Sequence, residues 1–154
     1  MVEIPRAIVI RTSVVYGPER QAKNFVYQLL RRCRAGETVR VPADQLSSPT
    51  YNQDLAVASV ELAEREALGL IHVAGAEILG RYAFALLACR VFGVDASRVE
   101  PVTTAALNQR APRPLRAGLR IDTARRLLGA TLRPAEAGLR AMREALAGDF
   151  GTSS

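Results

Sequence analysis

AIVI, residues 7–10, is a short run of β-favouring apolar residues with no polar residue in it. A strand with one wet face alternates apolar and polar residues, so this continuous run predicts a strand covered on both faces, as in a parallel sheet. Such a strand needs neighbouring strands and helical crossovers. Only six residues precede it, so we expect its sheet partners upstream and interpret the chain as the C-terminal half of a larger fold.

Outward from this strand, short strand patterns alternate with longer helical ones. The further strands are predicted over 39–41, 70–75 and 99–103, and the helices over 21–35, 54–68, 81–92, 123–128 and 134–147. Asp122 is expected to cap the fourth of these helices, and the polar stretches 42–52 and 105–118 are predicted to be loops. The pattern indicates an α/β fold, with one unit over residues 1–148 and a disordered tail over 149–154.

The composition is that of a folded protein. Of the 154 residues, 49% are hydrophobic and 23% are charged, which excludes a disordered chain. No apolar run approaches the roughly 20 residues needed to cross a bilayer, and the first ten residues lack the pattern of a secretory signal peptide. Cys33 and Cys89 lie far apart in the sequence, which indicates buried thiols in a reducing compartment. We therefore expect a cytoplasmic location and no membrane partner.

The net charge of +6 is concentrated in one part of the chain. Residues 104–146 hold nine arginines against three acidic residues, whereas residues 1–103 are close to neutral. Twenty of the 21 basic residues are arginine, a bias more typical of codon composition than of selection for phosphate contacts. The sequence also lacks metal-ligand spacings and the motifs of nucleic-acid-binding folds. We therefore predict that these arginines form a solvated surface that does not bind nucleic acid.

Two polar patches lie near the start of the chain. RTSVVYGP, residues 11–18, places Thr12 and Ser13 where a strand gives way to a loop. Ligands of open α/β sheets bind beyond the carboxyl ends of the strands, which favours these hydroxyls for contact; the alternative is that they only cap the strand. Asn24 heads the next helix, where it suits a diphosphate oxygen, although asparagine is more often only a cap there.

Two further patches lie on loops. Asp44, Gln45 and Thr50 belong to a polar loop whose side chains can bond to sugar hydroxyls, a weak signal because loops are generally polar. Arg113 stands between two prolines in QRAPRP, residues 109–114. A stiff backbone lowers the entropy cost of presenting its guanidinium, whose planar fork suits a phosphate. The alternative is an ordinary arginine on an exposed loop.

Taken in order, these patches resemble one known family. RTSVVYGP is followed by NFVYQLL (24–30), DQLSSPTYNQDLA (44–56), GLIHVAG (69–75), APRPLRAGL (111–119) and IDTARRLLG (121–129). Together they are similar to the C-terminal half of dTDP-4-dehydrorhamnose reductases, which are extended short-chain dehydrogenases. The resemblance runs from about residue 7 to residue 146, nearly the whole chain.

The resemblance implies the C-terminal portion of an NAD(P)-binding Rossmann-type fold, with few strands and a helical substrate-binding lobe. It implies reduction of a nucleotide-linked 4-keto-deoxysugar by NADPH or NADH, as in dTDP-rhamnose biosynthesis. It places Thr12 and Ser13 near the nicotinamide and the sugar, Asn24 by the diphosphate, Asp44, Gln45 and Thr50 along the pocket, and Arg113 near the phosphates.

The sequence also departs from this family. The family's glycine-rich cofactor turn and its catalytic Tyr-x-x-x-Lys are absent, so we expect the cofactor to be bound mainly by a missing N-terminal half and the chain alone to lack dehydrogenase activity. An aromatic residue common in the family is replaced by Val14, and a capping Ser or Thr by Gly80. The expected partners are a dTDP-4-keto-deoxyhexose and an upstream cofactor-binding half or a second copy of the chain.

Two other functions remain open from the sequence. The regulatory subunit of methionine adenosyltransferase looks like the same fold and shares the Arg-Pro loop, and it is a binding partner without activity of its own. A stand-alone module that binds nucleotide sugars without turnover is the other alternative.

Overall fold

The computed structural model describes residues 7–149, in which short strands and helices alternate. The strands are β1 (Ile8–Arg11), β2 (Val15–Tyr16), β3 (Val39–Pro42), β4 (Leu46–Ser47), β5 (Thr50–Tyr51), β6 (Gly69–His72), β7 (Leu79–Gly80), β8 (Val99–Val102) and β9 (Arg116–Ala117). The helices are α1 (Phe25–Arg34), α2 (Asn52–Glu64), α3 (Arg81–Phe92), the 3-10 turn η1 (Ala105–Leu107), α4 (Asp122–Leu127) and α5 (Ala135–Asp149).

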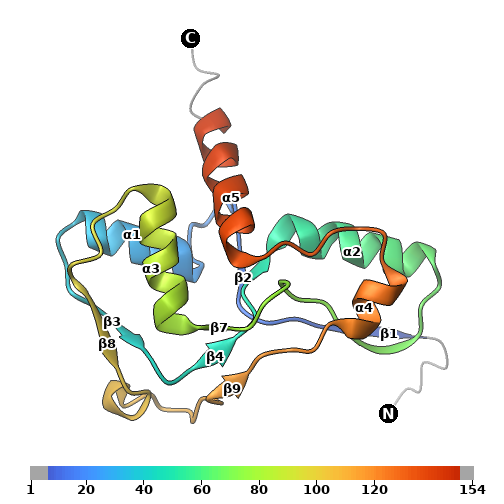
Figure 1. Cartoon of the computed structure of the whole chain (residues 1–154), viewed down its shortest axis with the longest axis horizontal. Helices are drawn as coiled ribbons and strands as arrows, with labels where there is room; N and C mark the ends of the chain where they lie inside the picture. Colours follow the sequence, from blue (N-terminus) through green and yellow to red (C-terminus); the bar gives the residue numbers. More distant parts are fainter. Residues whose placement is uncertain (1–6, 150–154) are drawn as a thin grey trace.

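The strands pair across long stretches of sequence, and most pairs are parallel (Figure 1). β1 pairs with β6, with Ile8 opposite Gly69, and β3 pairs with β8, with Val39 opposite Val99. β2 pairs with β5, and β4 lies between the parallel β9 and the antiparallel β7. The predicted α/β class and the parallel pairing of the AIVI strand are therefore confirmed.

One apolar core lies beside the β1–β6 pair. Side chains of α2 and α4 pack here with Ile71 of β6 and with Ile8 and Ile10 of β1. Because side chains alternate across a strand, Val9 and Leu70 point to the opposite face, where they are 57% and 53% exposed. The prediction of a strand buried on both faces is wrong for the described residues, since only one face is covered. We call the other the outer face.

The second core joins α1, α3 and α5 to the β3–β8 pair, at the other end of the molecule from α4 and β1 (Figure 1). Tyr16 lies within it, 5.1 Å from Phe84 between ring centroids, and its hydroxyl donates to the carbonyl of Ala135 at 3.0 Å. Burial raises the pKa of the Tyr16 phenol. Gly138 of α5 lies against this hydroxyl, at a position where a Cβ would overlap it.

Several predicted boundaries shift in the structure. Three strands of two residues (β4, β5 and β9) occur in segments predicted to be loops, and two more (β2 and β7) occur where no strand was predicted. Asp122 is wrong as a helix cap: it is the first residue of α4, and its carboxylate accepts from the Arg120 side chain. Asp149, assigned to the tail, ends α5, and the rest of that tail lies outside the described residues, as do residues 1–6.

Glu61 of α2 ties this helix to the segment that follows α4. Its carboxylate accepts from the backbone N–H groups of Gly129 at 2.7 Å and Ala130 at 3.0 Å, and it pairs with Arg65 at 2.7 Å. These bonds favour the ionised form, so the hydrogen bond from Gly129, with that from Arg65 next, lowers the pKa of Glu61 below its ordinary value of 4.5.

We expect this carboxylate to make stability depend on pH in acid. Its pKa is lower in the folded than in the unfolded chain, so its contribution is fully present above about pH 4.5 and is lost as the pH falls through the folded pKa. Urea unfolding at pH 7 and pH 3.5 measures this. Glu61→Gln should be less stable than wild type at pH 7 and should show a flatter pH dependence; an unchanged slope would contradict the assignment.

Candidate functional site

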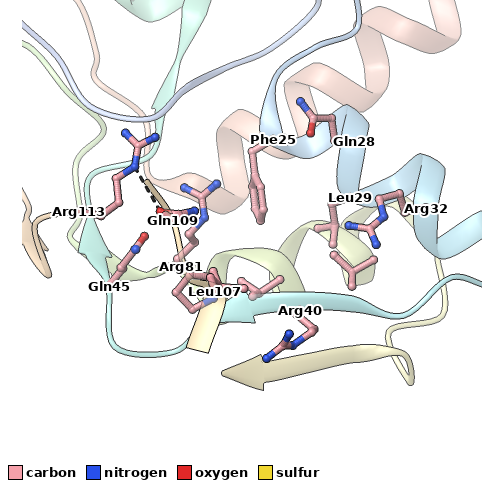
Figure 2. A pocket seen from close by; sticks show the side chains of 13 residues that line it. Phe25, Gln28, Leu29, Arg32, Arg40, Gln45, Arg81, Leu107, Gln109 and Arg113 are labelled. Atoms are coloured by element: carbon pink, nitrogen blue, oxygen red, sulfur yellow. Dashed lines mark hydrogen bonds between the residues drawn. The ribbon is translucent and has the colours of Figure 1, made fainter. Parts of the chain in front are cut away.

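A cavity of about 380 Å³ opens between α1, β3, the start of α3 and the chain after η1 (Figure 2). Its wall is made by Phe25, Gln28, Leu29, Arg32, Val39, Arg40, Val41, Pro42, Gln45, Arg81, Leu107, Gln109 and Arg113. Four of these residues are arginines and none is acidic. The cavity is therefore strongly electropositive.

Regular structure explains how the wall is assembled. Phe25, Gln28, Leu29 and Arg32 are spaced three or four residues apart, so α1 presents them along one side. Strand alternation buries Val39 and Val41 of β3 and leaves the intervening arginine exposed at the rim. α1 and β3 therefore form a continuous wall, while α3 and the 107–113 segment bring further residues from later in the chain.

Two of the four arginines are already bound by protein oxygens. The Arg32 side chain donates to Glu37 at 2.8 Å and to the carbonyl of Thr38 at 2.9 Å. Arg40 donates to the carbonyl of Ala106 at 3.3 Å. These contacts hold the two side chains and partly satisfy their hydrogen-bonding capacity.

The other two arginines have no carboxylate partner within residues 7–149. The Arg81 guanidinium lies over the Phe25 ring, 4.3 Å from its centroid, and the Nε of Arg113 donates to Gln109 at 3.3 Å. Figure 2 shows the Arg81 guanidinium between the Phe25 ring and the Gln109–Arg113 pair. Burial lowers the pKa of Arg81, and the positive charge of Arg113 lowers it further.

This arrangement is suited to binding an anion. Two guanidinium groups that repel each other become favourable neighbours when a phosphate or carboxylate lies between them, because each offers a planar fork of donors. A partly enclosed site also strengthens charge-assisted hydrogen bonds relative to bulk water. An apolar side chain such as Leu107 or Phe25 can pack against a less polar part of the same ligand.

The structure brings two of the predicted site residues, Gln45 and Arg113, together at this cavity. Asp44 precedes Gln45 in the chain and shares a hydrogen-bond partner with it. The Asp44 carboxylate accepts from the hydroxyl of Thr104 at 2.7 Å and from its backbone N–H at 2.9 Å, while Gln45 donates to the same hydroxyl at 3.0 Å. The hydrogen bond from the Thr104 hydroxyl lowers the pKa of Asp44, which keeps this carboxylate ionised.

Asn24 lies immediately before α1 and caps it. Its Oδ1 accepts from the backbone N–H groups of Val26 at 3.1 Å and Tyr27 at 3.4 Å, and its Nδ2 donates to the carbonyl of Gly17 at 2.9 Å. Of the two alternatives predicted for Asn24, the helix cap accounts for its side-chain contacts in this structure. It precedes Phe25 of the cavity wall without lining the cavity itself.

Thr12, Ser13 and Thr50 form a separate cluster beyond the carboxyl end of β1. Thr50 is fully buried; its hydroxyl donates to the carbonyl of Ser13 at 2.7 Å and accepts from the backbone N–H of Gly75 at 3.2 Å. The hydroxyl of Ser13 donates to the carbonyl of Ala117 at 3.3 Å. These hydroxyls hold neighbouring loops together and do not line the cavity.

The sequence-based prediction missed Phe25, Arg32, Arg40 and Arg81. Phe25 was read only as part of an apolar helix face, and Arg81 only as the beginning of a helix. A basic residue at the first position of a helix is unfavourable for the helix dipole, and this was the local signal that Arg81 has another role. The contact between Arg81 and Phe25 depends on how α1 packs against α3, so it cannot be predicted from the sequence of either helix alone.

The sequence matches a family model described as the RmlD substrate binding domain over residues 2–147. It is 39% identical over 111 residues to the dTDP-4-dehydrorhamnose reductase of Mycobacterium tuberculosis H37Rv, covering 71% of this chain and 36% of that protein. It is 34% identical over 143 residues to a probable dTDP-4,6-dihydroxy-2-methyloxan-3-one 4-ketoreductase of Streptomyces antibioticus, covering 92% of this chain and 47% of that protein.

Solved structures agree with these relatives. The dTDP-4-dehydrorhamnose reductase of Bacillus anthracis, determined in complex with NADP, superimposes with a TM-score of 0.81 at 28% identity, over 90% of this chain and 48% of that one. The orthologue from Clostridium acetobutylicum gives a TM-score of 0.82 at 26% identity, over 93% of this chain and 50% of that one. The resemblance found in the sequence motifs and the Rossmann-type fold class are confirmed, and the chain spans at most about half the length of these relatives.

Proposed function

Because this chain belongs to the RmlD substrate binding domain family, we propose that it forms the sugar-nucleotide-binding part of an NAD(P)H-dependent reductase acting on a nucleotide-linked 4-keto-deoxysugar. The observation that carries the proposal is the acid-free cavity with four arginines, two of which lack a carboxylate partner in the described chain. A diphosphate is the part of a nucleotide sugar that such a cavity would bind.

The predicted residues in the cavity wall and those outside it receive different roles in this proposal. Arg113 binds the diphosphate, and Gln45 of the wall and the adjacent Asp44 bond to hydroxyls of the sugar or ribose. Thr12 and Ser13 lie beyond the end of β1, the position that open α/β sheets use for ligands, and would face the reacting sugar. Asn24 and Thr50 support the site by fixing α1 and the neighbouring loops.

We propose that the cofactor, NADPH or NADH, is held mainly outside these residues. The described chain has no glycine-rich turn of the family type, and the hydroxyls of Ser13 and Thr50 already donate to backbone carbonyls. This does not fit a cradle for the cofactor diphosphate. The outer face, with Val9 and Leu70 exposed, supports an additional cofactor-binding part packed against β1 and β6.

The free cysteines indicate the compartment in which the protein acts. No helix within residues 7–149 has the length and apolar character needed to cross a membrane. Cys33 and Cys89 are neighbouring free thiols, of which Cys89 is buried as predicted and Cys33 is only partly buried. Free thiols suit a reducing compartment, so we propose that the protein acts in the cytoplasm.

Titration of the 154-residue chain with dTDP-rhamnose in a calorimeter tests the proposed function. Arg113→Ala removes a charge-assisted hydrogen bond that contributes about 1.5–3 kcal/mol, so we expect affinity to fall by roughly ten- to a hundredfold. Arg120→Ala is the matched control, because Arg120 pairs with Asp122 on the surface and does not line the cavity. Binding that is equally strong in both variants would remove Arg113 from the site, and no binding by the wild type would refute the proposal.

A further inference from the structure

Arg81 is held in place through its backbone and through the end of its side chain. It is the first residue of α3, and its backbone N–H donates to the carbonyl of Gln45 at 2.9 Å. At the other end, its guanidinium stacks on Phe25 of α1, 4.3 Å from the ring centroid. A stacked guanidinium keeps its edge N–H groups available, because the ring occupies only its face. Figure 2 shows this guanidinium toward the Gln109–Arg113 pair.

No carboxylate within residues 7–149 pairs with the Arg81 guanidinium. Its neighbour in the cavity is another cation, Arg113, while Arg32 on the opposite wall is paired with Glu37. Arg81 is half-buried beside the exposed Arg113, and the repulsion between these like charges, added to the partial loss of solvation of Arg81, destabilises the ligand-free protein. Arg81 therefore costs stability in the ligand-free chain, and residues that do so are typical of binding sites.

We infer that Arg81 is a second diphosphate-binding residue, which acts with Arg113 so that each guanidinium takes one phosphoryl group and the cavity selects diphosphates over monophosphates. This inference rests on the proposed function and adds to it a residue and a basis for selectivity. Both forks are held before a ligand arrives, Arg81 by Phe25 and Arg113 by Gln109. Preorganised donors lose less entropy on binding, which favours a ligand with two anionic groups at fixed spacing.

The test compares thymidine diphosphate with thymidine monophosphate as probes of the 154-residue chain by calorimetry. We expect Arg81→Met to weaken diphosphate binding by at least about tenfold and monophosphate binding by less, so that the preference for the diphosphate falls. Methionine keeps an apolar contact with the Phe25 ring. Arg120→Met is the matched control and should change the preference by less than about threefold, because Arg120 pairs with Asp122 on the surface and does not line the cavity.

A melting curve of the ligand-free variants separates binding from structure. If Arg81 serves the ligand, the melting temperature of Arg81→Met equals or exceeds that of wild type while diphosphate affinity falls. A lower melting temperature together with weaker binding would overturn the inference, unless Arg81→Lys melts like wild type and still loses the preference for the diphosphate. A third outcome would refute this inference alone: the wild type prefers the diphosphate, Arg113→Ala weakens diphosphate binding, and Arg81→Met leaves the preference unchanged. A wild type that binds neither probe refutes the proposed function as well.

Discussion

Gly75→Ala should lower the free energy of unfolding by about 3 kcal/mol or more, because the added methyl group has no room. A Cβ at this position would lie 1.9 Å from the carbonyl oxygen of Pro49 and 3.0 Å from its carbonyl carbon. Both atoms belong to backbone, so no side chain can rotate away. The Gly75 N–H also donates to Thr50, so the shift would strain the loop that carries three of the predicted site residues. Urea unfolding followed by circular dichroism measures the loss.

Gly80→Ala is the matched control for this substitution. Gly80 has an ordinary negative φ, and its nearest neighbour for an added Cβ is the Ala83 side chain at 3.9 Å. It is the N-cap residue of α3, where alanine is less favourable than glycine, so we expect a cost of about 1 kcal/mol, well below that of Gly75→Ala. If the two substitutions lowered the free energy of unfolding equally, the close approach of Gly75 to Pro49 would not be the reason that Gly75→Ala is destabilising.

Asp54→Ala should cost about 2–3 kcal/mol, the second largest effect we expect. Asp54 is 7% exposed; one carboxylate oxygen accepts from the backbone N–H of Arg133 at 2.9 Å, and the other pairs with the Arg133 guanidinium at 3.4 Å. The carboxylate also lies in the first turn of α2, where negative charge is favoured. Its removal leaves a backbone donor without its partner and loosens the segment that leads into α5. Chemical unfolding at neutral pH measures the effect.

Two comparisons make this prediction specific. Asp54→Asn keeps an oxygen that can accept from the Arg133 N–H, so it should cost less than the alanine variant. Asp122→Ala removes an ion pair of similar chemistry on the surface, where the Arg120 and Asp122 side chains are 89% and 55% exposed, and should cost below about 1 kcal/mol. A cost for Asp122→Ala as large as for Asp54→Ala would contradict the assigned role of burial.

The sequence predicted the longer elements because their patterns are local. AIVI gave a strand, the spacing of Phe25, Val26, Leu29 and Leu30 gave α1, and the 81–92 segment gave α3 with its exact bounds. What the apolar run of AIVI could not give was the exposure of Val9, which depends on what covers the strand. Two-residue strands such as β4 and β9 are too short to have a periodicity, so their polar segments were read as loops.

The candidate site was predictable only where a residue carried its own signal. Arg113 stood out between two prolines, and Gln45 in a polar loop, and both line the cavity. Thr50 was chosen for the same polarity but is buried by its hydrogen bonds to neighbouring loops, which only the fold determines. Arg81 and Phe25 became candidates only when α1 and α3 packed together.

The parallel pairing of distant strands also sets how the chain reaches its native state. Ile8 can pair with Gly69, and Val39 with Val99, only after the ends of a long chain segment have come together. These two segments, 8–69 and 39–99, overlap in the sequence. Each closure costs entropy before any ladder bond forms. Refolding from urea should therefore be slow for a chain of this size, on the order of milliseconds to seconds rather than microseconds, with helices forming ahead of the sheet.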